Sequence, residues 1–186
     1  MNGTVDGTKE GVAGGGTSKS RSGTVILGLG NSILSDDAVG ILAAREAGKL
    51  LDGCPGIVTA ENERGGMDVL DEIGPYERAV LVDGIKTGRK PPGTIFLLSA
   101  REFIPTRRLS GFHDLDLSTA LELARRLGLP IPGEIFVLAV EIIDDVNFGD
   151  KCSPEVEAAI SKVAAAAAAK ALGRPIPNEI EVVTTL

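Results

Sequence analysis

The sequence predicts an α/β protein: a three-layer α/β/α sandwich around a twisted, mostly parallel sheet of five strands. Short apolar segments, typical of strands buried on both faces, alternate along the chain with segments of helical apolar spacing. Of the 186 residues, 43% are hydrophobic, which is enough for a substantial core. Only 3% are aromatic, so Val, Ile, Leu and Ala must form that core.

The expected elements follow from these patterns and from their flanking residues. Asp36 or Ser35 is expected to cap the first helix, and Ser153 and Pro154 to begin the last one. With the first strand in the centre and the second and third on either side of it, the carboxyl end of the first strand borders a topological switch point. Strands are expected at 24–30, 56–61, 78–85, 93–99 and 134–142, and helices at 38–51, 67–74, 115–128 and 154–173.

Residues 1–23 differ in composition from the rest of the chain. They are rich in Gly, Ser, Thr and Lys, so we expect a disordered tail before a single domain at 24–186. The tail lacks the apolar stretch of a secretory signal. No segment approaches the roughly 20 apolar residues that span a bilayer. A cytoplasmic protein is therefore expected.

Charge and cysteine content exclude further classes of function. The formal net charge of -7 and the sequence pI of about 4.8 make nucleic acid and anionic membranes poor partners. Cys54 and Cys152 form no CxxC pattern, which argues against a disulfide framework. Neither thiol has a visible activating partner, so structural or incidental roles are expected for both.

Three residues are the candidates for chemistry. Because one acid is enough to cap the helix that follows the first strand, Asp36 is assigned to the cap and Asp37 to the crevice. Asp83 ends the third strand, where open α/β sheets bind ligands and where desolvation raises the pKa of an unpaired carboxyl group. His113 is the only histidine, so any imidazole chemistry must use it. The alternative is that both acids cap backbone groups and that His113 is an ordinary surface residue.

Two carboxylates and one imidazole are compatible with two kinds of site. They suit a divalent transition metal whose coordination is left partly open. They equally suit two acids that activate a water molecule with a histidine nearby, and the spacing does not decide between the two. A serine nucleophile is not indicated, because the sequence contains no GxSxG motif.

A glycine-rich turn at Gly28, Gly30 and Asn31 allows a different hypothesis, a dinucleotide-binding module with Glu61 as the ribose-binding acid. The match is imperfect, because Ile33 stands where GxGxxG requires its third glycine. Two acids at the start of the next helix would also oppose a pyrophosphate there. Nucleotide binding is therefore the weaker interpretation.

As a set, the motifs resemble those of the hydrogenase maturation endopeptidases. The resemblance extends from Thr24 to about Leu172 and combines a GxGN…D(D/E)xxG signature, a VDA-like strand end and a single downstream histidine. The segments that carry it are LGLGNSILSDDAVG, GMDVLDEI, LVDGIKTGRKPPGTIFLL, HDLDL and CSPEVEAAI.

The resemblance implies a monomeric α/β/α endopeptidase that removes the C-terminal extension of the [NiFe]-hydrogenase large-subunit precursor after nickel insertion. Asp37, Asp83 and His113 match the metal-contacting positions of the family. Nickel belongs to the substrate, so no permanently bound cofactor is expected. Gly65, Gly66 and the loop 100–114 are expected to help admit the substrate tail, together with the turn at Gly28, Gly30 and Asn31. A nickel-binding maturation chaperone without peptidase activity is the alternative.

Overall fold

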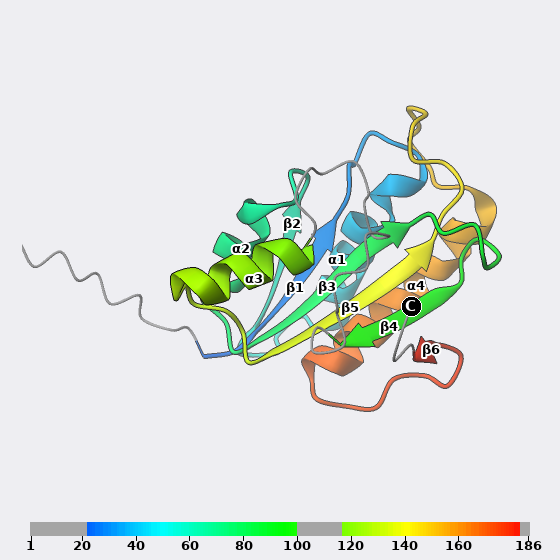
Figure 1. Cartoon of the computed structure of the whole chain (residues 1–186). Helices are drawn as coiled ribbons and strands as arrows, with labels where there is room; N and C mark the ends of the chain where they lie inside the picture. Colours follow the sequence, from blue (N-terminus) through cyan, green and yellow to red (C-terminus); the bar gives the residue numbers. More distant parts are fainter. Residues whose placement is uncertain (1–21, 100–116, 183–186) are drawn as a thin grey trace, which may run out of the picture.

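The apolar segment that begins at Thr24 forms an inner strand of the sheet in the computed structural model, which describes residues 22–99 and 117–182 (Figure 1). This strand, β1, pairs in parallel with β2 on one side and β3 on the other, which is the arrangement on which the predicted switch point depends. Within the described residues the sheet has six strands in the order β2-β1-β3-β5-β4-β6. Their bounds are β1 Thr24–Leu29, β2 Ile57–Asn62, β3 Arg78–Ile85, β4 Ile95–Ser99, β5 Glu134–Glu141 and β6 Glu181–Val182.

The sheet differs from the prediction at one edge. A sixth strand, β6, is added by two residues that pair in parallel with β4, so the expected number of five strands is corrected to six among the described residues. β4 runs antiparallel to its neighbour β5. Because β4 follows β3 without an intervening helix, it can return beside β5 in the opposite direction, whereas a parallel neighbour would require a longer crossover. The mostly parallel α/β architecture is confirmed.

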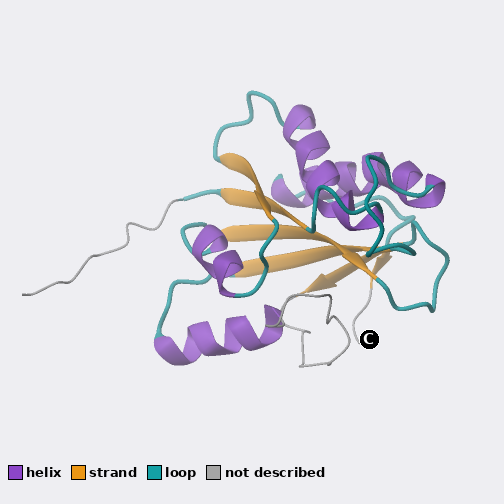
Figure 2. Ribbon diagram, turned by 90° about the horizontal axis from the view of Figure 1, so that it is seen from above, coloured by secondary structure: helices purple, strands orange, loops and turns teal. Residues whose placement is uncertain are grey.

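Helices cover both faces of the sheet (Figure 2). One core cluster packs α1 and α4 against one face, and a second cluster packs α2 and α3 against the other. Successive residues of β3 alternate between the clusters, since Val80 and Val82 belong to the first and Ala79 and Leu81 to the second. The helix bounds are α1 Val39–Leu50, α2 Met67–Ile73, α3 Leu117–Leu127 and α4 Pro154–Ala171.

The alanine run of α4 lies against α1 inside the first cluster. Ala164, Ala166 and Ala167 are buried together with Ala43 and Ala44 of α1. Side chains this small let two helices approach closely, and alanine also has the highest helix propensity. The run is therefore an ordinary helix-packing surface.

The start of α1 lies very close to the sheet because two glycines face each other. A Cβ on Gly28 of β1 would lie 2.4 Å from the Gly40 carbonyl oxygen. A Cβ on Gly40 would lie 2.2 Å from the Leu29 carbonyl oxygen and 2.3 Å from that of Val82. No side chain fits in either space. These glycines therefore fix where α1 begins relative to the carboxyl ends of β1 and β3.

The predicted cap of α1 was wrong. A 3-10 turn at Asp36–Ala38 precedes the helix, and neither Ser35 before the turn nor Ala38 before α1 makes a side-chain capping hydrogen bond. The last helix begins with Ser153 and Pro154 as predicted, but the Ser153 hydroxyl also makes no capping bond to its own helix. The Ser35 hydroxyl instead donates to the Lys151 carbonyl oxygen, and the Ser153 hydroxyl donates to the Asp36 carboxylate.

None of the helices in the part of the chain that the structure describes is long and apolar enough to cross a membrane. The predicted tail at 1–23 lies almost wholly outside the described residues. So does His113, together with the loop 100–114.

Candidate active site at the carboxyl edge of the sheet

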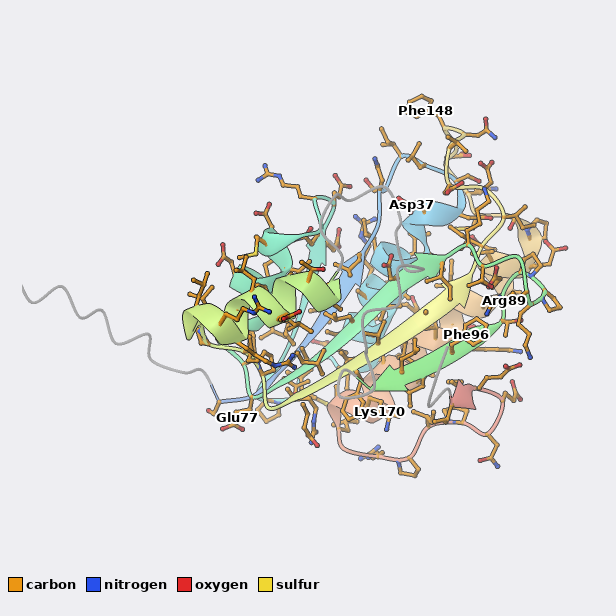
Figure 3. All side chains as sticks on the ribbon, in the orientation of Figure 1. Asp37, Glu77, Arg89, Phe96, Phe148 and Lys170 are labelled. Atoms are coloured by element: carbon orange, nitrogen blue, oxygen red, sulfur yellow. The ribbon has the colours of Figure 1, made fainter. Side chains whose placement is uncertain are left out.

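Asp37 and Asp83 lie close together where β1 and β3 end. Asp83 is the sixth residue of β3 and is paired in register with Ala139 of β5. Asp37 belongs to the 3-10 turn that follows β1, and Figure 3 shows it beside the carboxyl end of the sheet. The charge of Asp37 acts directly on Asp83. The parallel pairing of β1 and β3 thus brings together two acids that are far apart in the sequence, as predicted.

The environment of Asp83 favours its protonated form. Its side chain is half-buried, and desolvation is the main cause that raises the pKa of Asp83 from its ordinary value of 3.8 to about 7. The Asp37 carboxylate raises that pKa further, while a backbone hydrogen bond at Gly84 lowers it. A carboxyl group with a pKa near neutrality can both accept and donate a proton under physiological conditions. A divalent cation between the two acids would favour their ionised forms instead.

Gly30 allows the backbone after β1 to pass very close to the backbone of Asp37. Its φ of 134° lies in the region that only glycine adopts readily, and a Cβ there would lie 1.9 Å from the Asp37 carbonyl oxygen. The Gly30 amide donates to the Asn62 carbonyl oxygen at the end of β2. Gly30 therefore positions Asp37, a role that is distinct from the substrate contact predicted for it.

The glycine-rich turn is occupied by contacts within the protein. Gly28 packs against α1, and the Asn31 side chain accepts a hydrogen bond from the Ile33 amide at 3.2 Å, which stabilises the turn. Glu61, the acid required by the dinucleotide hypothesis, forms an ion pair with Arg45 at 2.7 Å. In the structure, Gly28 therefore serves helix packing, Asn31 stabilises the turn, and Glu61 belongs to an ion pair.

Asp36 is a buried residue whose role was missed. Its side chain is fully buried, and its carboxylate accepts hydrogen bonds from the backbone amides of Ile143 and Asp144, both at 3.1 Å. It also accepts from the Ser153 amide at 2.6 Å and from the Ser153 hydroxyl at 3.1 Å. Asp36 therefore ties the turn that carries Asp37 to the loop between β5 and α4. The sequence contained only one hint, the presence of two adjacent acids where a single cap was needed.

Asn62 organises the loop that contains Gly65 and Gly66. Its side-chain oxygen accepts hydrogen bonds from the amides of Arg64 at 2.8 Å and Gly65 at 2.7 Å, and its amide group donates to Glu72 at 3.0 Å. Gly65 and Gly66 have φ values of 65° and 61°, which favour glycine. The loop is joined to the turn after β1 through Ser32, whose hydroxyl donates to Glu63 at 2.5 Å. The sequence pattern indicated the two glycines but not Asn62.

The third predicted residue, His113, lies outside the described residues. Within the described ranges, no group of three or more Asp, Glu, His or Cys side chains is arranged to hold a metal ion. The described part of the site is therefore a pair of carboxylates. The assignment of Asp37, Asp83 and His113 as a set of ligands stays a prediction.

The two cysteines have different environments. Cys152 is buried, and its Sγ lies 3.4 Å from the Ser35 carbonyl oxygen. Burial, with added effects of the Asp36 and Glu157 charges, raises the pKa of the Cys152 thiol to about 12. Cys54 is half-buried in the turn after α1. A thiol with so high a pKa is a poor nucleophile, so Cys152 is not suited to catalysis.

Comparison with protein families decides the identity of the chain. A family model described as hydrogenase maturation protease matches residues 64–170, which is more than half of the chain. The protein belongs to the hydrogenase maturation protease family. The matched region contains Asp83, His113, Gly65 and Gly66, whereas Asp37 precedes it. A search of curated proteins finds no match.

Solved structures of hydrogenase maturation proteases have the same fold. The maturating endopeptidase HybD from E. coli is 22% identical with a TM-score of 0.62, over 84% of this chain and 98% of that one. The protease HycI from Thermococcus kodakarensis is 20% identical with a TM-score of 0.61, over 85% of this chain and 96% of that one. At these identities the likeness concerns the fold.

As a hydrogenase maturation protease, this protein is an endopeptidase and thus a hydrolase. The predicted family and the predicted activity, proteolytic processing of the hydrogenase large-subunit precursor, are confirmed. The roles of individual residues and of nickel belong to the proposal that follows.

Proposed function

We propose that this hydrogenase maturation protease removes the C-terminal extension of a nickel-loaded [NiFe]-hydrogenase large-subunit precursor, with Asp37, Asp83 and His113 as its site residues. The observation that carries the proposal is the proximity of the Asp37 and Asp83 carboxylates at the carboxyl edge of the sheet. This edge is where open α/β sheets bind ligands. The protein works in the cytoplasm as a monomer.

Nickel enters this site as part of the substrate. Asp37 and Asp83 supply carboxylate oxygens and His113 supplies an imidazole nitrogen, a donor set that suits a divalent transition metal. The charge of Asp37 opposes ionisation of Asp83, and a cation held between the two acids would relieve that repulsion. Recognition of nickel on the precursor would thus require no cofactor bound permanently by the protease.

The chemical step is hydrolysis of one peptide bond. The oxygen of a water molecule attacks the scissile carbonyl carbon, the carbon–nitrogen bond breaks, and the amine of the released extension takes up a proton. Two activations of the water fit the site. In one, a carboxylate of Asp37 or Asp83 accepts the proton of the water, and in the other the substrate's nickel lowers the pKa of that water.

Gly65 and Gly66 belong to the proposed entrance for the extended tail of the substrate. Their loop is joined to the turn after β1 by the Ser32–Glu63 hydrogen bond, and it is stiffened by Asn62. Gly28, Gly30 and Asn31 act mainly by shaping that turn. We therefore expect substitutions in the two loops to alter the productive binding of the tail.

Intact-mass spectrometry of the precursor tests this proposal. A nickel-loaded large-subunit precursor is incubated with the unsubstituted protein or with the variants Asp83→Asn and His113→Ala, and a nickel-free precursor is included. The variant Asp52→Asn serves as a matched control, since Asp52 is an exposed acid in the turn after α1. We expect loss of one C-terminal fragment with the unsubstituted protein and with Asp52→Asn, and only from the nickel-loaded precursor.

Three outcomes would contradict the proposal in different ways. Cleavage by Asp83→Asn or His113→Ala at the normal rate would show that the substituted residue is not part of the site. Equal cleavage of nickel-free precursor would show that the metal is not recognised. Tight nickel binding by the isolated protein, without any change in precursor mass, would instead support the nickel-chaperone alternative.

A further inference from the structure

Two neighbouring loops beside the candidate active site expose four large apolar side chains. Ile33 belongs to the turn after β1, and Ile143, Val146 and Phe148 belong to the loop between β5 and α4. Their exposed fractions are 57%, 49%, 62% and 80%, respectively. Figure 3 shows Phe148 at the outer end of its loop, on the same side of the molecule as Asp37. The three residues of the later loop, Ile143, Val146 and Phe148, are called the apolar patch below.

Hydrogen bonds between the two loops hold the apolar patch in place. The Ser35 amide donates to the Asn147 carbonyl oxygen at 3.0 Å, and the Gly149 amide donates to the Ile33 carbonyl oxygen at 3.2 Å. An isolated β-bridge pairs Leu34 with Phe148 between these bonds. The apolar side chains are thus presented on paired backbone segments, which lowers the entropy lost when a partner binds.

The carboxylate network described above connects this patch to the site. Asp36 accepts hydrogen bonds from the amides of Ile143 and Asp144, and the residue that follows it in the chain is Asp37. Ile33 lies four residues before Asp37 in the same turn. A protein that places a peptide bond at Asp37 and Asp83 therefore brings the body of its structure next to the apolar patch.

Charged groups lie around the apolar patch. Lys86 and Asp145 form an ion pair at 2.7 Å, and the exposed residues Asp150 and Lys151 follow Phe148 in the loop. An apolar centre with a charged and polar rim is the usual composition of a protein–protein interface. Contiguous exposed apolar side chains on a soluble domain mark such contacts, and aromatic residues contribute most to their affinity.

We propose that the apolar patch docks the folded body of the large-subunit precursor, at a contact separate from the site that holds nickel and the scissile bond. This inference rests on the proposed function. A second copy of the chain is a poorer occupant, because a copy seated on these loops would stand beside Asp37 and Asp83 and hinder substrate entry. The docking contact would select the cognate precursor and leave the chemistry to the two acids.

Binding measurements with paired double variants test the docking contact. The nickel-loaded large-subunit precursor is titrated with Asp83→Asn protein, in which the complex is not consumed by cleavage. Val146→Ser combined with Phe148→Ser removes the centre of the patch. The control combines Leu127→Ser with Val182→Ser, whose side chains are 62% and 65% exposed at the end of α3 and on β6, away from the patch. All four residues are exposed, so neither pair is expected to unfold the protein.

We expect the patch variant to raise the Kd for the precursor at least tenfold and the control variant to leave it unchanged. In otherwise unsubstituted protein, the patch variant is expected to raise the KM for precursor cleavage by a similar factor. Equal Kd values for the patch and control variants would overturn the docking contact. If the unsubstituted protein is a dimer and the patch variant is a monomer, the patch is an interface between two copies of the chain. That result would also overturn the docking contact.

The same measurements separate this inference from the proposed function. A precursor that binds but is never cleaved by the unsubstituted protein contradicts the proposed function, while the effect of the patch variant on Kd still supports docking. Normal cleavage with unchanged Kd and KM in the patch variant overturns the docking contact and supports the proposed function as a protease. A precursor that does not bind at all overturns both.

Discussion

The carboxylate of Asp36 accepts two hydrogen bonds from Ser153, a residue 117 positions later in the sequence, at 2.6 Å from its amide and 3.1 Å from its hydroxyl. Ser153 is the residue before α4, and Asp36 begins the turn that carries Asp37. The start of the last helix and the first acid of the site are therefore held by one buried side chain. This link explains why neither residue caps its own helix.

Replacing Asp36 by Ala is expected to destabilise the fold by about 3 kcal/mol, because buried amide donors at Ile143, Asp144 and Ser153 lose their acceptor. Urea denaturation of the variant and of an Asp52→Ala control measures the difference. Asp52 is exposed, so its replacement should change the free energy of unfolding by less than about 0.5 kcal/mol. Equal stability of the two variants would show that the Asp36 network contributes little.

Gly40→Ala is expected to destabilise the protein by roughly 1–3 kcal/mol, although alanine is the better helix former. The added Cβ would lie 2.2 Å from the Leu29 carbonyl oxygen and 2.3 Å from that of Val82, and both are backbone atoms that cannot move aside easily. Gly48→Ala in the same helix is the control, since the atoms nearest to its added Cβ belong to the Thr59 side chain, at 3.0 Å, and not to the backbone. Thermal unfolding should show a lower Tm for Gly40→Ala and a nearly unchanged one for Gly48→Ala.

Asp83 is expected to make the metal-free protein less stable as the pH rises from about 4 to about 7. The folded protein keeps the Asp83 proton up to a pKa of about 7, whereas the unfolded chain releases it near the ordinary value of 3.8. The folded state therefore binds more protons in this window, and its stability falls with pH until Asp83 is ionised.

Asp83→Asn removes this titration. The variant should be more stable than the parent protein by roughly 1–4 kcal/mol at pH 8 and little different at pH 4. Chemical denaturation at both pH values, in the presence of a chelator, measures the effect. A stability difference that does not change between the two pH values would contradict the raised pKa.

Cys54 is expected to react with iodoacetamide before Cys152 in the folded protein at pH 8. The pKa of Cys152 is raised to about 12 by burial and by neighbouring negative charges, so its thiolate is scarce. Peptide mass spectrometry locates the label, and both cysteines should react in urea. Because neither thiol belongs to the proposed site, cleavage of the precursor should persist after Cys54 is modified. Loss of cleavage in step with labelling would implicate a cysteine in catalysis.

Asn62→Ala should loosen the loop of Gly65 and Gly66. The amides of Arg64 and Gly65 lose their acceptor, so their hydrogen exchange should accelerate by about tenfold or more, which corresponds to the loss of roughly 1.4 kcal/mol of local stability. Hydrogen-exchange mass spectrometry over residues 62–67 measures this change. An amide in α4 serves as the internal reference, and uniform acceleration throughout the protein would indicate global destabilisation instead.

Local sequence pattern predicted β3 at its observed bounds, 78–85, with Asp83 near its carboxyl end. A central β1 between β2 and β3 was the condition for the predicted switch point, and the structure has that order. These predictions succeed because buried parallel strands leave continuous apolar runs, and crossover geometry then restricts which strands are neighbours. The proximity of Asp37 to Asp83 follows from that order alone.

Other features depend on contacts that leave no local pattern. β6 has only two residues, and its pairing with β4 depends on where the chain after α4 returns. The antiparallel direction of β4 depends on the connection from β3. The role of Asn62 is equally hidden, because a single asparagine at a strand end is compatible with many turns.

The sequence by itself determined the α/β class and the two acids at the carboxyl ends of the strands, because these depend on periodicity and on chain connectivity. Only the tertiary structure decided what Asp36 does and that Phe148 pairs with the turn after β1. Both depend on the pairing of the turn after β1 with a loop more than 100 residues later. A buried carboxylate takes the nearest backbone donors in space, and no local pattern encodes which donors those are.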